Sequence, residues 1–155
     1  MESLKIAIVG ATGMVGRMFL KVLEEKGIQA RYTLFASSRS AGQKLSFMEE
    51  SYTVEPLEEN SFAGRGFRVA LFSAGGEVSR KFAPLAAEAG AVVIDNSSCW
   101  RMDPLVPLIV PQVNPESLPG YMQKGIIANP NCSTIQAVVA LKPLADAFGL
   151  KRVVY

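Results

Sequence analysis

The sequence predicts an α/β fold built on a doubly wound, mostly parallel sheet. Two observations lead to this prediction: short apolar runs alternate with segments of helical periodicity, and glycines stand where several of the runs end. The chain has 155 residues, which is enough for one domain and part of a second. Because 49% of the residues are hydrophobic and 19% are charged, the chain can bury a substantial core.

The first part of the chain is expected to form a strand–helix–strand unit. Residues 4–9 are an apolar run that stops at Gly10, which is typical of a buried parallel strand. Apolar side chains then recur at helical spacing over residues 15–23, and Gly27 is a stop signal for that helix. Residues 32–36 form the second strand, so the connection is a right-handed crossover.

The alternation of strands and helices continues along the chain. A small hairpin is expected from residues 44–48 and 52–54, turning around residues 49–51. A helix is expected at residues 78–89. Further strands are expected at residues 68–72, 91–94 and 126–128.

The region after residue 100 is less regular. Residues 103–120 are rich in proline and show little periodicity, so we expect an extended excursion on the surface. Residues 133–148 are apolar on nearly all sides, which predicts a buried helix. Residues 151–155 are expected to begin another strand, as though the chain stops partway into a second domain.

Composition excludes several classes of function. A net charge of +2 is too small to indicate a nucleic-acid or membrane-surface partner. Histidine is absent, so this chain alone supplies neither a histidine-ligated metal site nor histidine acid/base catalysis, and no metal is expected. Cys99 and Cys132 form no CxxC motif, and no signal peptide or membrane-spanning run is present. We therefore expect free thiols and a cytoplasmic location.

A glycine-rich turn between the first strand and the first helix predicts nucleotide binding. Gly10 allows a sharp turn, Gly13 allows the backbone to approach a pyrophosphate, and Gly16 allows helix and strand to pack closely. The helix N-terminus then offers free N–H groups to phosphate. The alternative, a glycine-rich turn without a ligand, is less favoured because the strand–turn–helix context of a Rossmann-like domain is present.

The end of the second strand indicates which nucleotide is bound. NAD sites usually place an acidic residue there to hold the ribose 2′-hydroxyl. This chain instead has residues 37–42, SSRSAG, with Arg39 among hydroxyl side chains. A guanidinium attracts a 2′-phosphate that a carboxylate would repel, so NADP is favoured over NAD, although a solvated polar loop is the plainer alternative.

Two further segments carry candidate chemistry. Cys132 stands where the loop Asn-Pro-Asn becomes a helix, and a helix dipole favours the thiolate form at that position. A buried structural cysteine is an equally good interpretation from the residues alone. Arg101 follows a strand end, where it could clamp an anion, although a surface salt bridge is the commoner role.

Taken together, these segments resemble the aspartate-semialdehyde dehydrogenase family. The resemblance rests on the joint order and spacing of GATGMVG at 10–16, SSRSAG at 37–42, FSAGG at 72–76, DNSS at 95–98 with Arg101, VPLIVPQVN at 106–114 and NPNCST at 129–134. It implies NADPH-dependent reduction of L-aspartyl 4-phosphate to the semialdehyde, with release of phosphate, through a thioester on Cys132. That reaction serves the biosynthesis of lysine, threonine, methionine and isoleucine.

The resemblance also implies the residues of each site. The nucleophile is Cys132, and the substrate phosphate is held by Arg101 and Asn131. The cofactor-binding residues are Gly10, Thr12, Gly13, Met14, Val15, Gly16, Ser38, Arg39, Ser40, Ser73 and Gly75.

The chain departs from the family pattern in what it lacks. Family enzymes use a histidine as general acid/base later in the chain than residue 155, and later residues for the substrate carboxylate and for dimer contacts. We therefore expect an NADP-binding domain at residues 1–129 and the beginning of an α+β catalytic and dimerisation domain at 130–155. Such a fragment is expected to have little or no turnover, and the full-length enzyme to be a homodimer or homotetramer.

Other readings remain open. N-acetyl-glutamyl-phosphate reductase has similar chemistry and a similar turn, but it typically places glycine before its cysteine, where this chain has Asn131. A non-catalytic NADP-binding sensor or an atypical short-chain reductase is a second alternative. Such reductases need Tyr-x-x-x-Lys, whereas here Tyr121 is followed by Lys124, one residue too soon, with Gly125 in the required place.

Overall fold

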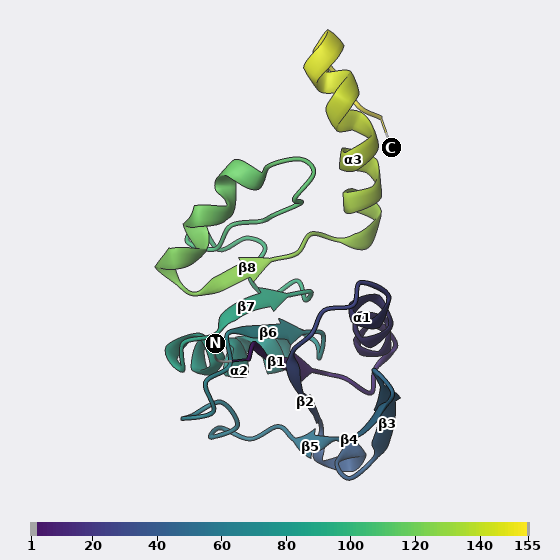
Figure 1. Ribbon diagram of the computed structural model, residues 1–155. Coiled ribbons are helices and arrows are strands. Elements are labelled where there is room, and N and C mark those ends of the chain that lie inside the picture. Colours follow the sequence, from purple (N-terminus) through teal and green to yellow (C-terminus); the bar gives the residue numbers. More distant parts are fainter. Residues whose placement is uncertain (1–2, 155) are drawn as a thin grey trace.

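The computed structural model describes residues 3–154, and within them the chain forms one six-stranded sheet in which every pairing is parallel (Figure 1). The strands are β1 (Lys5–Val9), β2 (Arg31–Ala36), β5 (Glu55–Pro56), β6 (Val69–Phe72), β7 (Val92–Asp95) and β8 (Ile126–Ala128). Their order in space is β5-β2-β1-β6-β7-β8, so the chain winds outward in both directions from β1. The predicted doubly wound α/β fold is confirmed, and only the short edge strand β5 was not anticipated.

Helices cover the two faces of the sheet. In β1 the side chains alternate, so Ile6 and Ile8 join the core that contains Leu20 of α1 (Met14–Glu25). Ala7 and Val9 of β1 face the other way, into the core that contains Ala83 and Ala86 of α2 (Gly76–Glu88). Both faces of the central strands are therefore buried, which explains why their sequences are continuously apolar.

The predicted hairpin is confirmed as β3 (Lys44–Phe47) and β4 (Glu50–Thr53), with its turn slightly earlier than expected. Met48 and Glu49 form the turn, and both have positive φ angles of 53° and 62°. The Met48 amide also donates a 2.8 Å hydrogen bond to the Glu24 carboxylate of α1. The hairpin tip is thus attached to the helix that covers the same face of the sheet.

The proline-rich segment at 103–120 is more structured than expected. Its second half enters the 3₁₀ helix η2 (Pro115–Gln123), and Val106, Ile109 and Val110 are buried. The Ile109 amide donates to the carbonyl of Ala128, and the Ala128 amide donates to the carbonyl of Pro107. The segment therefore lines the outer edge of β8, a role that local periodicity does not reveal.

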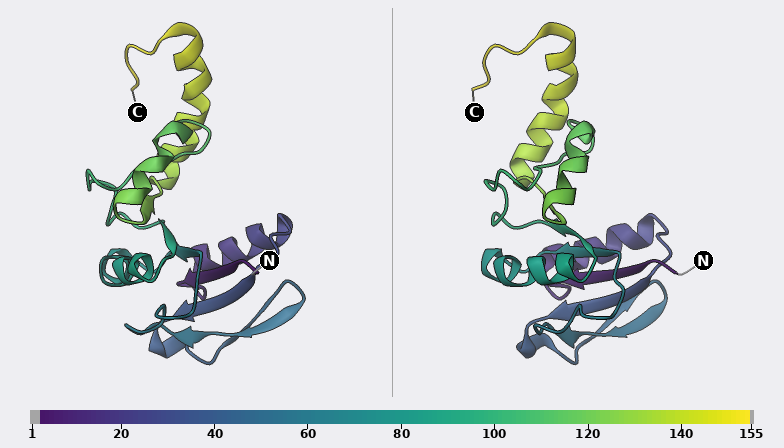
Figure 2. Two further views of the ribbon diagram at one scale, coloured as in Figure 1. Left: turned by 60° about the vertical axis from the view of Figure 1, so that its left-hand side comes forward. Right: turned by 90° about the vertical axis from the view of Figure 1, so that its left-hand side faces the viewer.

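The last helix, α3 (Cys132–Phe148), contradicts the expectation that it is buried. None of its residues is buried, and the helix rises away from the sheet (Figures 1 and 2). Its apolar side chains are at most half-buried, so no segment among residues 3–154 buries any of them completely. The expected strand is also absent from residues 151–154, while Tyr155 lies outside the described residues. No helix within residues 3–154 has the length and apolar character needed to cross a membrane.

Candidate functional site at the carboxyl edge of the sheet

The loops that carry the candidate residues meet along one edge of the sheet. Because all the strands are parallel, their carboxyl ends lie at the same edge, and α/β proteins bind ligands there. Gly10 follows β1, Ser73 follows β6, Asn96 follows β7 and Asn129 follows β8. The winding reverses between β1 and β6, because the chain continues from β1 to β2 on one side and later returns to β6 on the other.

The glycine turn after β1 is packed so tightly that side chains are excluded. Gly10 has a φ of +87°, and a Cβ atom there would lie 2.3 Å from the carbonyl oxygen of Ser73. A Cβ atom on Gly16 would lie 2.1 Å from the carbonyl oxygen of Gly10. Helix α1 begins at this turn without a side-chain cap, so its first N–H groups are available to an anion.

A cavity of about 350 Å³ opens beside this turn. Of the expected cofactor-binding residues, the cavity is lined by Gly10, Thr12, Gly13 and Ser73. The remaining ones lie around it in α1 (Met14, Val15, Gly16), in the 3₁₀ turn η1 (Ser38, Arg39, Ser40) and at the N-cap of α2 (Gly75). The side chain of Arg39 is exposed just beyond the end of β2, beside the exposed Ser37 that lines the cavity.

The sequence analysis missed the walls of this cavity, which are mostly apolar. They are formed by Val9, Ala36, Ser37, Leu57, Ala74, Val78 and Phe82. Val9 and Ala36 end their strands, and Val78 and Phe82 share one face of α2, so strand ends and helix period could have identified them. Leu57 comes from a stretch without a periodic signal, and only the fold brings it here.

Arg101 joins the ends of the neighbouring strands β7 and β8. Its Nε donates to the carbonyl of Asn129 at 2.9 Å, and its Nη2 donates to the carbonyl of Asn96 at 3.3 Å. The side chains of Asn96 and Asn129 are also bonded, with Nδ2 of Asn129 donating to Oδ1 of Asn96 at 2.6 Å. A guanidinium has five donors, so Arg101 is held by two and keeps others for an anion.

The two cysteines occupy different settings. Cys132 is exposed and is the first residue of α3, three residues after Asn129. Its neighbour Asn131 is the N-cap, and the Asn131 Oδ1 accepts a 3.0 Å hydrogen bond from the Ser133 amide. The side chain of Asn131 therefore has a structural partner already, and its Nδ2 is the group that could reach a ligand. Cys99, by contrast, is half-buried.

A buried carboxylate that the sequence analysis did not single out supports the loop after β7. Asp95 is fully buried, and its Oδ2 accepts a 2.6 Å hydrogen bond from the Ser97 hydroxyl. The Ser97 oxygen in turn accepts from the amide of Cys99 at 3.1 Å. The other oxygen of Asp95, Oδ1, has no partner within the described residues. These contacts fix the path of the loop that leads to Arg101.

The chain is similar to known proteins over most of its length. The model of a family described as "Semialdehyde dehydrogenase, NAD binding domain" matches residues 5–121. An aspartate-semialdehyde dehydrogenase of Aquifex aeolicus is 60% identical over 152 residues, which are 97% of this chain and 44% of that protein. The chain thus spans less than half the length of this relative.

Solved structures agree with the sequence match. The crystal structure of aspartate semialdehyde dehydrogenase II from Vibrio cholerae, complexed with ASA, has a TM-score of 0.92 and 49% identity, covering 97% of this chain and 49% of that one. The aspartate semialdehyde dehydrogenase from Candida albicans, solved with NADP, has a TM-score of 0.76 and 31% identity, covering 95% and 48% of the two chains.

Proposed function

The chain belongs to the aspartate-semialdehyde dehydrogenase family, and we propose that it carries the cofactor-binding half and the nucleophile of an NADP-dependent enzyme of that kind. The proposed reaction is the reductive dephosphorylation of L-aspartyl 4-phosphate to the 4-semialdehyde, a step in amino-acid biosynthesis in the cytoplasm. Residues 1–129 form the NADP-binding domain in this proposal. Residues 130–155 begin the catalytic and dimerisation domain of a homodimer or homotetramer, whose remaining part would cover the exposed apolar surface of α3.

The cavity beside the glycine turn fits a dinucleotide. Gly10 and Gly16 allow the turn to pack against the Ser73 carbonyl and against the start of α1, and the uncapped N–H groups of α1 beside this turn suit a pyrophosphate. The exposed Arg39 beyond β2 suits a 2′-phosphate, as do the hydroxyls of Ser38 and Ser40. When bound, the reduced nicotinamide supplies a hydride. The relative from Candida albicans was solved with NADP, which supports the same choice of cofactor here.

Cys132 and Arg101 supply the chemistry of acyl transfer. In the proposed first step the Cys132 thiolate attacks the acyl carbon, a C–S bond forms, and the C–O bond to phosphate breaks. The donors of Arg101 that its carbonyl partners leave free would stabilise the departing phosphate. The resulting thioester accepts hydride at its carbonyl carbon, and the C–S bond then breaks to release the aldehyde and the thiolate.

One observation carries this proposal more than any other. The chain enters α3 directly from β8 at the carboxyl edge, so Cys132 stands at the same edge as the glycine turn, with Arg101 joining the ends of β7 and β8. An isolated nucleotide-binding domain has no need for an exposed thiol and a phosphate-binding arginine at that edge. This argues for an acyl-transfer enzyme over an NADP sensor.

Thiol reactivity tests the role of Cys132. In the Cys99→Ser variant Cys132 is the only thiol, and we expect iodoacetamide to alkylate it faster than a free thiol at neutral pH, and inorganic phosphate to slow the reaction. The matched control is Cys132→Ser, which retains Cys99 and should react slowly without any effect of phosphate. Equal alkylation rates in the two variants would contradict the proposed role of Cys132 as the nucleophile.

Cofactor titration tests the nucleotide site separately. The unmodified chain should bind NADP more tightly than NAD, and Arg39→Asp should erode or reverse that preference, by about tenfold or more. Lys21→Asp, on the exposed side of α1, is the matched control and should leave the preference intact. Equal affinity of the unmodified chain for the two cofactors contradicts the NADP assignment.

A further inference from the structure

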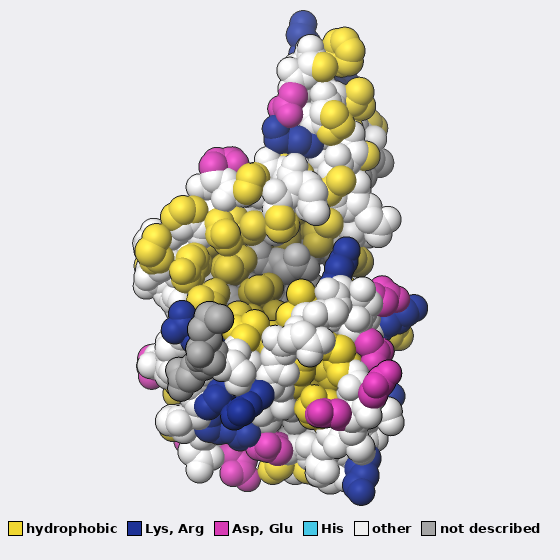
Figure 3. All heavy atoms as spheres, viewed as in Figure 1, with side chains coloured by type: hydrophobic (Ala, Val, Ile, Leu, Met, Phe, Trp, Pro, Cys, Tyr) yellow, Lys and Arg dark blue, Asp and Glu magenta, His cyan; other side chains and the backbone are white. Residues whose placement is uncertain are grey.

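The edge of the sheet opposite the proposed active site, where the strands begin, carries a row of like charges. Lys5 begins β1, Arg31 begins β2, and Arg68 directly precedes β6. The register pairs Lys5 with Arg31, and the amide of Arg68 donates to the carbonyl of Lys5 at 2.9 Å. These three basic residues therefore stand side by side on adjacent strands. Figure 3 faces this edge and shows Lys and Arg side chains gathered there.

Acidic side chains of the described residues do not pair with this row. Within residues 3–154, no carboxylate lies within 4 Å of the charged groups of Lys5, Arg31 or Arg68. Like charges on neighbouring strands repel and destabilise a sheet. Arg65, which lies close by, differs because both its terminal nitrogens donate to the Glu55 carboxylate, at 2.7 and 3.0 Å. Among residues 3–154, Arg65 therefore has an acidic partner, whereas Lys5, Arg31 and Arg68 have none.

A cavity of about 320 Å³ opens at this row, and no acidic residue in the described part of the chain lines it. It is lined by Lys5, Arg31, Thr33, Gly64, Arg65 and Phe67. Nζ of Lys5 donates to the carbonyl of Arg65 at 3.0 Å, which leaves the other ammonium hydrogens for a ligand. The hydroxyl of Thr33 accepts from Nη2 of Arg65 at 3.3 Å, so its own hydrogen remains to be donated. Lys5 and Thr33 can therefore each present a donor to a ligand beside the guanidinium of Arg31.

Arg65, which lines the cavity beside these donors, is held in place by several contacts. The Arg65 guanidinium lies 5.3 Å from the centre of the Phe35 ring and 5.2 Å from that of Phe67. Together with the bidentate ion pair to Glu55, these contacts restrict Arg65 to one arrangement. The carbonyl that orients Lys5 thus belongs to a residue held on several sides.

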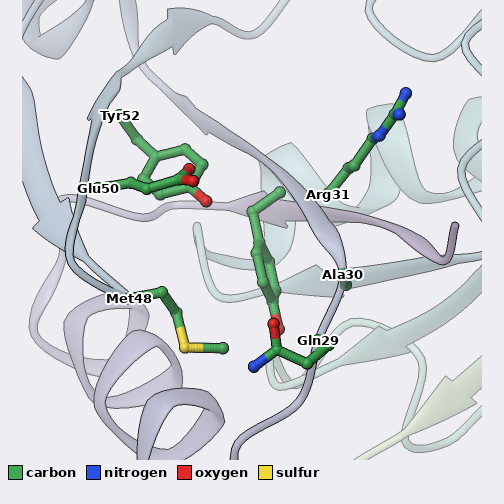
Figure 4. A pocket seen from close by; sticks show the side chains of 7 residues that line it. Gln29, Ala30, Arg31, Met48, Glu50 and Tyr52 are labelled. Carbon is green, nitrogen blue, oxygen red and sulfur yellow. The ribbon is translucent and has the colours of Figure 1, made fainter.

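A second cavity on the other side of Arg31 provides a contrast (Figure 4). It has about 350 Å³ of space, and its lining includes the Glu50 carboxylate beside Tyr52. The side chain of Arg31 points away from Glu50, Tyr52 and Met48. A negative charge within this second cavity disfavours an anion, whereas the charged residues among the described ones that line the cavity at Lys5 are all basic.

We propose that the cavity between Lys5 and Arg31 is a binding site for a small molecule bearing a phosphate or pyrophosphate group. The planar guanidinium of Arg31 can bind two phosphate oxygens at once, and the ammonium of Lys5 acts as a point charge beside it. An anion there would relieve the repulsion along the row of strand-initial charges. The site lies at the edge opposite the glycine turn, so it is separate from the proposed cofactor cavity and does not depend on the proposed function.

Titration with inorganic pyrophosphate at low ionic strength tests this site. Calorimetry on the 155-residue chain should show saturable binding that weakens as salt is added. Arg31→Gln and Lys5→Gln should each weaken it by about tenfold, whereas Lys5→Arg should retain it. Arg80→Gln, which removes an exposed charge from α2, is the matched control and should leave binding unchanged. Circular dichroism of each variant checks that the fold persists.

The outcomes that overturn this site are distinct from failure of the cofactor proposal. Absence of saturable binding overturns it, as does an equal loss in Arg80→Gln, which would indicate a general charge effect. Binding that is lost in Arg39→Gln or Arg101→Gln, but kept in Arg31→Gln and Lys5→Gln, would place the pyrophosphate at the carboxyl edge and also overturn it. NADP titration of Arg31→Gln should match the unmodified chain in every case.

Discussion

The parallel sheet and helix α3 are both rich in apolar residues, yet they differ completely in burial. Phe72 at the end of β6 has no exposed surface, while Phe148 at the end of α3 is 82% exposed. The central strands meet α1 on one face and α2 on the other, so each face has a partner close in sequence. Helix α3 has no such partner among residues 3–154, and none of its residues is buried.

The difference shows that the ability of a surface to be buried and the presence of a partner that buries it are separate properties. An apolar pattern specifies which surfaces can be buried, because hydrophobic free energy scales with the apolar area removed from water. It does not specify whether a partner surface is available. The sheet and α3 should therefore respond very differently to equivalent substitutions, and four predictions test this, beginning with the largest expected effect.

Replacing Gly10 with alanine should damage the sheet more than any change in α3. The new Cβ would meet the Ser73 carbonyl at 2.3 Å and would have to adopt a φ of +87°, so the free energy of unfolding should fall by about 4 kcal/mol or more. Urea denaturation followed by Trp100 fluorescence measures this. Gly13→Ala is the control, because its Cβ would meet only one carbonyl, at 3.3 Å, and should cost about 1 kcal/mol or less. Similar losses in both variants would contradict the packing described for the turn.

Truncating one phenylalanine in each region compares the two directly. Phe72→Ala should lower the free energy of unfolding by about 3–5 kcal/mol, because it leaves a cavity among buried aromatic rings. Phe148→Ala should change it by no more than about 0.5 kcal/mol, because that ring is already in water. The same denaturation experiment measures both. A large loss in Phe148→Ala would mean that α3 has a partner surface in solution.

Removing the cap of α3 should affect that helix without affecting the sheet. Asn131→Ala deletes the oxygen that accepts from the Ser133 amide, at a cost of about 1 kcal/mol to the helix. Hydrogen exchange should become about fivefold faster in the first turn of α3, while amides in β1 and β6 keep their protection. Asn131→Asp preserves the acceptor and should exchange at close to the original rate. Faster exchange in the strands as well would show that α3 supports the sheet.

The smallest expected effect is the pH dependence of stability that arises from Tyr52 in the hairpin, which packs against the sheet. Burial raises the pKa of Tyr52 to about 12, and the neighbouring Glu50 carboxylate adds to this shift. Since the unfolded state titrates near the ordinary value of 10, the contribution to stability is complete below pH 10 and is lost as the pH rises toward 12. Absorbance of the tyrosinate measures the titration. Glu50→Gln should remove only part of the rise in the pKa of Tyr52, because burial is the larger cause of that rise. A return of the pKa to 10 in this variant would instead make Glu50 the main cause.

Much of the fold and the glycine turn could be predicted from the sequence because their signals are local. The run before Gly10, the helical spacing after it and the glycines at 10, 13 and 16 all lie within one continuous stretch. The hairpin was predicted with its turn placed slightly late, because Met48 and Glu49 are not residues that usually adopt positive φ. The walls of the cavity beside the glycine turn were missed where, as with Leu57, no local period marks them.

Local patterns were enough to predict the order of strands and helices, the glycine turn at residues 10–16 and the residue types available for anion binding, because each depends on neighbours within a few positions. The tertiary structure alone decided that Arg101 ties the end of β7 to the end of β8, and that Lys5, Arg31 and Arg68 meet in one row. It also decided that α3 is exposed, although its sequence predicts burial. Pairing and burial depend on which distant surfaces the parallel sheet brings together. The sequence of one segment does not specify which distant segment it will pack against.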